Sequence, residues 1–233
     1  MAGRGRICVA VGAGDAESAA SLVAPVLPLV DVVEVRLDAM ARPQVAECCR
    51  LIDRPLLFTN RAAWEGGAAG GDDLARIEPL LLAVEQGAAF VDLELRADSR
   101  ARGRLLDAIQ GTATRLILSS HDFSATPPAG SLRDTLRRMA DSGAHIGKII
   151  TTARQATDVL RVLALQEEAR ELGMPLIAFC MGEVGRISRL ATLYLGGFMT
   201  YVAVDEEQGT APGQLSAARL HGLIELFADG HGN

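Results

Sequence analysis

The chain has 233 residues, of which 49% are apolar, and its net charge at pH 7 is −6. This composition provides enough apolar surface for a sizeable core. The acidic balance argues against binding to nucleic acid or to an anionic membrane surface. No apolar stretch is long enough to cross a membrane, and the early apolar run breaks at Gly12, so we expect neither a membrane span nor a signal peptide.

Strand and helix patterns alternate along the whole chain. Short apolar and β-branched runs predict eight strands, over Arg6–Val11, Val32–Arg36, Pro55–Thr59, Ala89–Glu94, Arg115–Ser119, His145–Ile150, Pro175–Cys180 and Phe198–Ala203. Helical periodicity predicts helices near residues 15–29, 41–52, 72–87, 98–110, 130–142, 154–172, 184–195 and 213–228. Eight βα units in this length predict a (β/α)8 TIM barrel, as a single domain over residues 1–233.

A doubly wound open sheet is the structural alternative. Such a sheet usually carries a glycine-rich phosphate loop after its first strand. Gly12-Ala13-Gly14 lacks the third glycine at the required spacing, which favours the barrel.

The cysteines indicate the redox environment. Four are present, two of them adjacent, and they show no disulfide framework spacing: Cys8, Cys48, Cys49 and Cys180. Free thiols in a reducing cytoplasm fit this pattern best.

Lys148 is the only lysine of the chain, and all the other Lys/Arg positions are arginine. It lies inside an apolar run that reads as a buried strand. Burial favours the neutral form of an amine, which attacks carbonyl carbons, whereas arginine stays protonated. Lys148 is therefore a candidate for Schiff-base formation, and a side chain that merely extends from a strand end to solvent is the structural alternative.

His121 is the one histidine that follows an apolar run at the end of a predicted strand. An imidazole that faces a Schiff-base lysine suits general acid–base catalysis near neutral pH, although a lone histidine is often structural. His145, His221 and His231 are not placed to join it, and no metal-ligand spacing appears. We therefore predict no metal site.

Further polar residues fall where a barrel gathers them, at the carboxyl ends of its strands. Glu34 and Arg36 are two apart on a strand and share a face, so they present an acceptor and a donor for vicinal hydroxyls, unless they form a structural ion pair. Arg61 precedes Glu65 and a glycine-rich segment that permits a mobile loop.

An anion site is expected near the last two strands. Arg189 lies in the helix that follows the seventh strand, and a helix N-terminus with nearby arginines binds anions. Thr210 precedes the turn before Gln214 and is able to bind the same anion. The ligand inferred from these groups is a small, hydroxylated, carbonyl-bearing carboxylic acid.

Seven segments, in order and at matching spacing from about residue 7 to 220, resemble type I 3-dehydroquinate dehydratase. They are Glu34-x-Arg36-x-Asp38; Phe58-Thr59-x-Arg61 with Glu65-Gly66-Gly67; Val91-Asp92-x-Glu94-Leu95; Ser119-x-His121-Asp122-Phe123 with Thr126-Pro127; the strand around Lys148; Met181-Gly182-x-x-Gly185-x-x-Ser188-Arg189; and Ala211-Pro212-Gly213-Gln214. The resemblance implies a (β/α)8 barrel, commonly a homodimer. It also implies a hydro-lyase that converts 3-dehydroquinate to 3-dehydroshikimate in the shikimate pathway of aromatic amino-acid biosynthesis, without metal or organic cofactor.

The resemblance also assigns roles. Lys148 would form the imine with the substrate ketone, His121 would move the protons, and Glu65 would orient or tune His121. The remaining carried-over residues would bind substrate: Arg189, Thr210 and Gln214 at the carboxylate, and Glu34, Arg36 and Arg61 at the ring hydroxyls. Thr210 stands where the family often has serine, and Ala10 stands where some members have serine.

Nearby charges also affect the protonation state expected for Lys148. We expect burial and the cationic Arg36, Arg61 and Arg189 to favour its neutral amine. Two alternatives remain at this stage: another class I Schiff-base aldolase-type barrel, and a non-catalytic ligand-sensing relative.

Overall fold

The computed structural model describes residues 4–205 and 213–228. Its nine strands are parallel and form one curled sheet in the order β7-β6-β5-β4-β3-β2-β1-β8-β9. They are β1 (Arg6–Val11), β2 (Val32–Arg36), β3 (Leu56–Thr59), β4 (Phe90–Glu94), β5 (Arg115–His121), β6 (Ile146–Thr152), β7 (Leu176–Met181), β8 (Met199–Ala203) and β9 (Leu215–Ser216). The predicted (β/α)8 barrel is confirmed, with β9 as a short addition beside β8.

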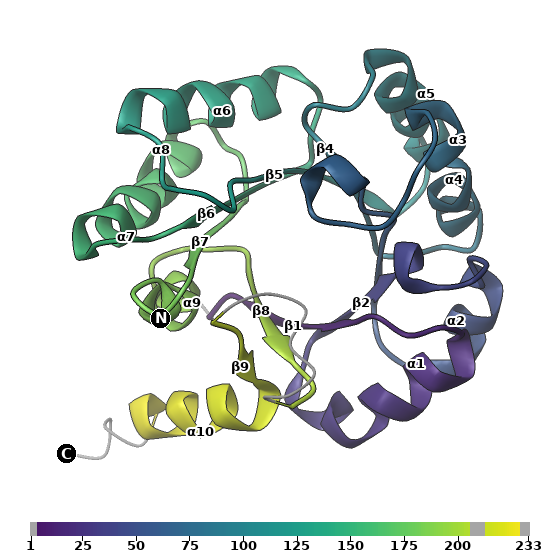
Figure 1. Ribbon diagram of the computed structural model, residues 1–233, viewed down its shortest axis with the longest axis horizontal. Helices are drawn as coiled ribbons and strands as arrows, with labels where there is room; N and C mark the ends of the chain where they lie inside the picture. The colour runs from purple at the N-terminus through teal and green to yellow at the C-terminus, as the bar shows by residue number, and fades with distance from the viewer. Residues whose placement is uncertain (1–3, 206–212, 229–233) are drawn as a thin grey trace.

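Helices form the outer layer of the barrel (Figure 1). The α-helices are α1 (Ala16–Val23), α2 (Val45–Leu51), α3 (Asp73–Arg76), α4 (Glu78–Glu85), α5 (Ser99–Ile109), α6 (Ala129–Asp141), α7 (Ala156–Leu163), α8 (Leu165–Glu171), α9 (Arg186–Tyr194) and α10 (Ala217–Ala228). Three short 3-10 helices join them: η1 (Ala24–Leu29), η2 (Leu37–Ala39) and η3 (Ala63–Glu65).

Four predicted helices differ from the observed ones. The segment 15–29 is α-helical only over α1 and continues as the 3-10 helix η1. The segment 72–87 divides into α3 and α4 around Ile77, where Pro79 in the first turn of α4 has no N–H to continue the preceding helix. The segment 154–172 divides into α7 and α8 at Ala164. The last helix begins at Ala217 rather than at residue 213, because Leu215 and Ser216 pair with β8.

Alternation along the strands creates two cores. One face of each strand packs against the helices, and the other face fills the barrel interior with residues such as Leu57, Ile117, Ile146 and Ile177. Lys148 is two residues from Ile146 on β6, so it shares the inward parity. The barrel is thus apolar toward the amino ends of its strands and charged toward their carboxyl ends.

The contact between β7 and β8 is an open seam. Phe198 N, just before β8, donates to Leu176 O at 2.8 Å, but no strand register joins the two fully described strands beyond that point. Helix α9 bonds to their backbone groups instead: Ser188 Oγ accepts from Cys180 N at 2.8 Å, and Arg189 Nη1 donates to Tyr201 O at 3.4 Å. The seam therefore brings the Arg189 side chain into the barrel mouth.

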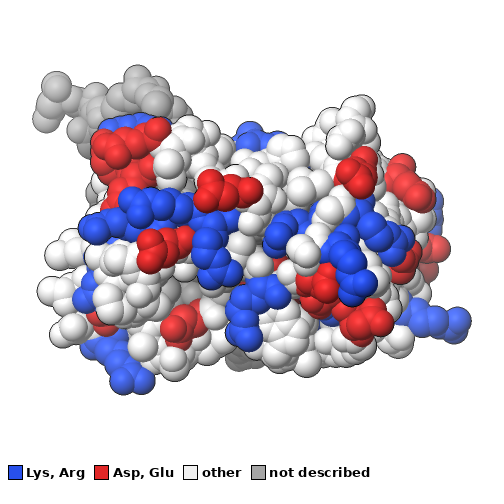
Figure 2. Space-filling model, turned by 90° about the horizontal axis from the view of Figure 1, so that it is seen from above, with Lys and Arg blue, Asp and Glu red and all other residues white. Residues whose placement is uncertain are grey.

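The outer surface carries both signs of charge. On the face that Figure 2 shows, basic and acidic side chains are interspersed, and no broad area of one sign covers it. In the part of the chain that the structure describes, no helix is long and apolar enough to cross a membrane.

Candidate active site

A pocket opens at the carboxyl ends of the strands. Its lining includes eight of the nine residues that the sequence predicted for the site: Glu34, Arg36, Arg61, Glu65, His121, Lys148, Arg189 and Gln214. It also includes Thr59, Gly66, Phe123, Ile150, Phe179, Met181 and Tyr201. The ninth predicted residue, Thr210, lies outside the described residues. Segments spread over 180 residues of sequence, from Glu34 to Gln214, thus meet in one cavity.

Lys148 lies at the centre of this pocket, with only 4% of its surface exposed. Its Nζ is 3.1 Å from Asp92 Oδ2 and 3.5 Å from Glu34 Oε1, and it lies 4.1 Å from the centre of the Tyr201 ring. The arginines expected near Lys148 are not its ion-pair partners, since among the described residues its ion pairs are with two carboxylates. These carboxylates stabilise a positive charge on the nitrogen, whether it is an ammonium or a protonated imine.

His121 and Glu65 form the second part of the site. His121 Nδ1 is 2.8 Å from Glu65 Oε1, so the Nε2 atom is the ring nitrogen left for a ligand. Burial raises the pKa of Glu65 to about 8, and the carboxylates of Glu94 and Asp92 act in the same direction, against Arg61. Burial, with the positive charges of Arg61 and Lys148, lowers the pKa of His121 well below its ordinary value.

These shifts set the tautomer of the imidazole. Near neutral pH the Glu65 carboxyl keeps its proton and donates it to Nδ1, and the neutral imidazole then carries its hydrogen on Nε2. Once Nε2 has lost that hydrogen, transfer of the Glu65 proton to Nδ1 restores a neutral ring whose Nε2 is a base. The pair is therefore able to act first as an acid and then as a base.

The loop that carries Glu65 is fixed by its backbone. Ala69 N donates to Arg61 O at 3.0 Å, and Ala63 N donates to Ala69 O at 3.0 Å. A Cβ atom at Gly67 would lie 2.1 Å from Arg61 O, so only glycine permits this close return of the chain. Phe123 stacks on the His121 ring with 6.0 Å between centroids, and its edge abuts Gly66.

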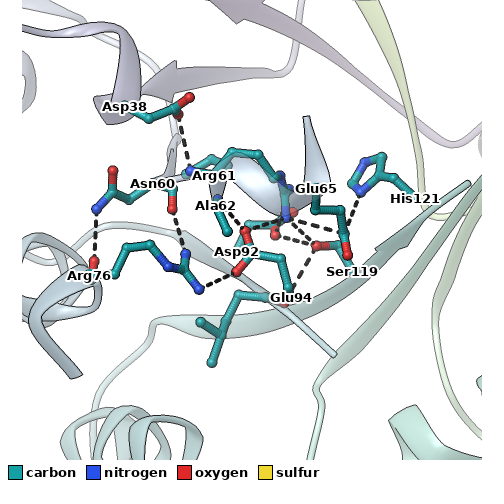
Figure 3. A network of polar contacts seen from close by, with 12 residues as sticks. Asp38, Asn60, Arg61, Ala62, Glu65, Arg76, Asp92, Glu94, Ser119 and His121 are labelled. Carbon is teal, nitrogen blue, oxygen red and sulfur yellow. Dashed lines mark hydrogen bonds and ion pairs between the residues drawn. The ribbon is translucent and has the colours of Figure 1, made fainter. Parts of the chain in front are cut away.

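Arg61 is the centre of a buried ionic network (Figure 3). Its Nη2 is 2.8 Å from Asp92 Oδ1, and its Nη1 is 3.0 Å from Glu94 Oε1 and 2.7 Å from Ser119 Oγ. Burial alone would raise the pKa of Asp92, but the adjacent Arg61 and Lys148 lower it below its usual range. Asp92 thus remains ionised and joins Arg61 to Lys148.

A second layer supports Glu94. Arg76 Nη2 is 2.7 Å from Glu94 Oε2, and Arg76 also exchanges hydrogen bonds with Asn60, donating to Asn60 O at 2.7 Å and accepting from Asn60 Nδ2 at 2.8 Å (Figure 3). Bonds from both sides therefore hold Glu94, which in turn orients Arg61.

Several of these residues were not among the predicted site residues. Asp92 and Glu94 are recognisable in the sequence as two acids at alternate positions of an apolar strand. Their spacing does not show which cation each of them contacts. Arg76 and Tyr201 gave no such signal, because the first lies in a helical segment and the second in an apolar strand. Only the fold brings Arg76 to Glu94 and Tyr201 to the pocket.

Arg36 lies at the rim. Its Nε and Nη2 atoms donate to Asp38 at 2.8 and 2.6 Å, and Asp38 also accepts from Arg61 N at 3.1 Å. Asp38 therefore fixes the orientation of the Arg36 guanidinium.

Arg189 and Gln214 also line the pocket. The Arg189 guanidinium packs 4.6 Å from the centre of the Phe179 ring, and burial lowers its pKa to about 10. A Cβ at Gly213 would lie 2.8 Å from Gly182 O, so the turn before Gln214 fits closely against the turn that leads into α9. This contact brings the two predicted anion-binding segments together.

Within the described ranges, no group of three or more His, Cys, Asp or Glu side chains is arranged to hold a metal ion.

Comparison with known proteins identifies the family. The model of the type I 3-dehydroquinase family matches residues 7–230. The chain belongs to the type I 3-dehydroquinase family. It is 43% identical over 197 residues to a 3-dehydroquinate dehydratase of Desulfotalea psychrophila, covering 84% of this chain and 87% of that one. A 3-dehydroquinate dehydratase of Syntrophobacter fumaroxidans is 37% identical over 214 residues, covering 87% and 89%.

Solved structures of the family agree with this assignment. A type I 3-dehydroquinate dehydratase of Clostridium difficile superposes with a TM-score of 0.86 at 26% identity, covering 98% of this chain and 94% of that one. The enzyme from Geobacillus kaustophilus gives 0.84 at 26% identity, covering 98% and 93%. The predicted family and the predicted enzyme class, a hydro-lyase, are therefore confirmed, and the aldolase-type and ligand-sensing alternatives lose support.

The buried Glu65 carboxyl predicts a pH-dependent stability. Because the pKa of Glu65 rises from its usual 4.5 to about 8 on folding, the native state holds more protons than the unfolded chain between these values. We expect the free energy of unfolding of the wild type to fall, relative to Glu65→Gln, as the pH rises through this window. Urea unfolding of both proteins at several pH values measures the difference, and a difference that is constant with pH would contradict the prediction.

Proposed function

We propose that this 3-dehydroquinase dehydrates 3-dehydroquinate to 3-dehydroshikimate through an imine at Lys148. The observation that carries the proposal is the pairing of β5 with β6, in which Ser119 lies opposite Lys148 and His121 opposite Ile150. Lys148 and His121 therefore face inward on neighbouring strands, one layer apart, and both line the pocket. A nucleophilic amine thus has a proton carrier beside it.

Imine formation is the first step. Lys148 reacts after its ammonium has lost a proton to solvent. The neutral amine then adds to the ketone carbon, and a C–N bond forms as the carbonyl electron pair moves to oxygen. This oxygen leaves as water with one proton from the nitrogen and one from Nε2 of His121. The product is a protonated imine, and transfer of the Glu65 proton to Nδ1 leaves Nε2 free as a base.

The protonated imine withdraws electrons from the adjacent carbon, and this permits elimination of the β-hydroxyl. Nε2 of His121 takes a proton from the carbon next to the imine, and the C–H electron pair forms an enamine. The enamine then expels the β-hydroxyl, which takes the proton from His121 and leaves as water. Addition of one water to the conjugated imine releases the product and the amine and returns a proton to the His121–Glu65 pair, so the net loss is one water.

The remaining pocket residues suit the substrate. We assign the carboxylate to Arg189 and Gln214, together with Thr210, which precedes Gln214 in the sequence. A buried guanidinium binds a carboxylate strongly and in a fixed orientation. Glu34, Arg36 and Arg61 are assigned to the ring hydroxyls, since together they offer acceptors and donors on the other side of Lys148.

A homodimer in the cytoplasm is part of the proposal. Exposed apolar side chains on α9 and α10 support the dimer: Ile187, Tyr194, Leu226 and Phe227. Tyr194 and Phe227 have ring centroids 5.7 Å apart and join the two helices into one apolar surface. Sedimentation equilibrium at micromolar concentration should give twice the chain mass, and a monomer would refute the dimer. The cytoplasmic location stays a prediction, supported by the four free cysteines.

The single lysine makes the imine directly testable. Borohydride in the presence of 3-dehydroquinate should add the mass of the reduced ligand to the protein, and peptide mapping should place it on Lys148. Lys148→Arg should reduce formation of the conjugated product, followed by its absorbance, to background, because arginine stays protonated. An adduct at the N-terminal amine, or turnover by Lys148→Ala, would overturn the mechanism.

Carboxylate binding by Arg189 is tested with a matched pair on α9. Arg189→Lys keeps the charge and loses the planar fork, so we expect KM to rise about tenfold to a hundredfold, as for loss of a charged hydrogen bond, with a smaller change in kcat. Arg186, which pairs with Glu183 at 3.0 Å on the surface, provides the control. Arg186→Lys should leave KM within about twofold, and equal effects of the two substitutions would contradict the assignment.

A further inference from the structure

Tyr201 has no role in the steps above, yet it contacts the reacting nitrogen. It lies on β8 with 5% of its surface exposed, and its ring centre is 4.1 Å from Lys148 Nζ. The ring also packs against Phe179 at a centroid distance of 6.1 Å, which fixes its plane. Lys148 is therefore enclosed by two carboxylates and one aromatic face.

The two carboxylates that contact Lys148 also contact other residues. Asp92 is shared between Lys148 and Arg61, and Glu34 also accepts from Thr59 Oγ1 at 2.8 Å. Among the described residues, the ring of Tyr201 meets only one cation, Lys148. A cation over an aromatic face is stabilised by the ring quadrupole, and most strongly where water is excluded.

The hydroxyl group of Tyr201 is not the active part. It is buried and has no hydrogen-bond partner among the described residues. Burial and the nearby Glu34 raise the pKa of this phenol well above its ordinary value, which favours its neutral form. The contact with Nζ is made by the ring.

The backbone of Tyr201 reaches the other part of the pocket. Its carbonyl oxygen accepts from Arg189 Nη1 at 3.4 Å across the open seam. One residue of β8 thus contacts both the cation proposed to hold the substrate carboxylate and the amine proposed to bind its ketone.

We propose that Tyr201 is a further catalytic residue, whose ring face stabilises the positive charge on the Lys148 nitrogen in the protonated imine. This inference rests on the proposed function. The ring faces the charge in the imine and in the transition states that form and hydrolyse it. Its effect therefore belongs to these steps, and binding of the substrate carboxylate is independent of it.

The test is a series of rings at position 201. Tyr201→Phe removes only the unpartnered hydroxyl, keeps the ring face and is the reference for the series. Replacement of Tyr201 by 4-fluoro-, 3,5-difluoro- and pentafluorophenylalanine keeps the aromatic shape while it weakens and then reverses the quadrupole. We expect the single-turnover rate of imine formation, followed by borohydride trapping, to fall stepwise to about one-tenth to one-thirtieth for the last member. KM should stay within about threefold across the series.

Two outcomes overturn the inference: equal rates across the fluorinated series, or a loss in Tyr201→Phe as large as in the pentafluoro variant, which would assign the effect to the hydroxyl. Thermal unfolding reports the fold of each variant, and if the pentafluoro protein does not fold, the slope over the less fluorinated rings decides. The wild-type adduct separates the two hypotheses. Without an adduct at Lys148 the proposed function fails, whereas an adduct with unchanged ring variants refutes only the role of Tyr201.

Discussion

The site depends on one carboxylate between two buried cations. Asp92 contacts Arg61 at 2.8 Å through one oxygen and Lys148 at 3.1 Å through the other. Removal of such charges from water is expensive, and apolar side chains of similar size often stabilise a core as well or better. The ionic network is therefore best explained by function: its charges and dipoles are already oriented before a ligand arrives, so none must reorganise as charge develops on the nitrogen.

Burial and the local charge balance together explain why the Glu65 carboxyl differs from the other three buried carboxyls. Three buried carboxylates, Glu34, Asp92 and Glu94, face three buried cations, Arg61, Arg76 and Lys148, in mutual ion pairs. Glu65 lies 3.8 Å from Arg61, which is already paired twice, and the pKa of Glu65 rises to about 8. The proton that the network leaves on Glu65 is the one that sets the tautomer of His121. The proposed acid–base chemistry thus follows from the burial of the Glu65 carboxyl, with the nearby Glu94 and Asp92 carboxylates acting in the same direction.

The sequence predicted the elements better than the contacts. Strand periodicity placed β1 and β2 at their observed bounds, since regular alternation and covered faces depend on local pattern. Lys148 and His121 also stood out alone, by composition and by position at strand ends. The partners of Lys148 did not, because Asp92 on β4 and Tyr201 on β8 each come from a strand two places away from β6, one on either side around the ring. Their contacts depend on register and barrel curvature, which no local pattern encodes.

The open seam shows how the fold and the chemistry constrain each other. A closed ladder between β7 and β8 would pair Cys180 N and Tyr201 O with each other's strands and leave no place for a guanidinium. Here Ser188 and Arg189 bond to these backbone groups, so the buried polar atoms are satisfied while Arg189 enters the pocket. Gly185 makes this possible, because a Cβ there would lie 2.4 Å from Met181 O and push α9 away. The glycine before α9 thus determines the position of Arg189, which we propose to hold the substrate carboxylate.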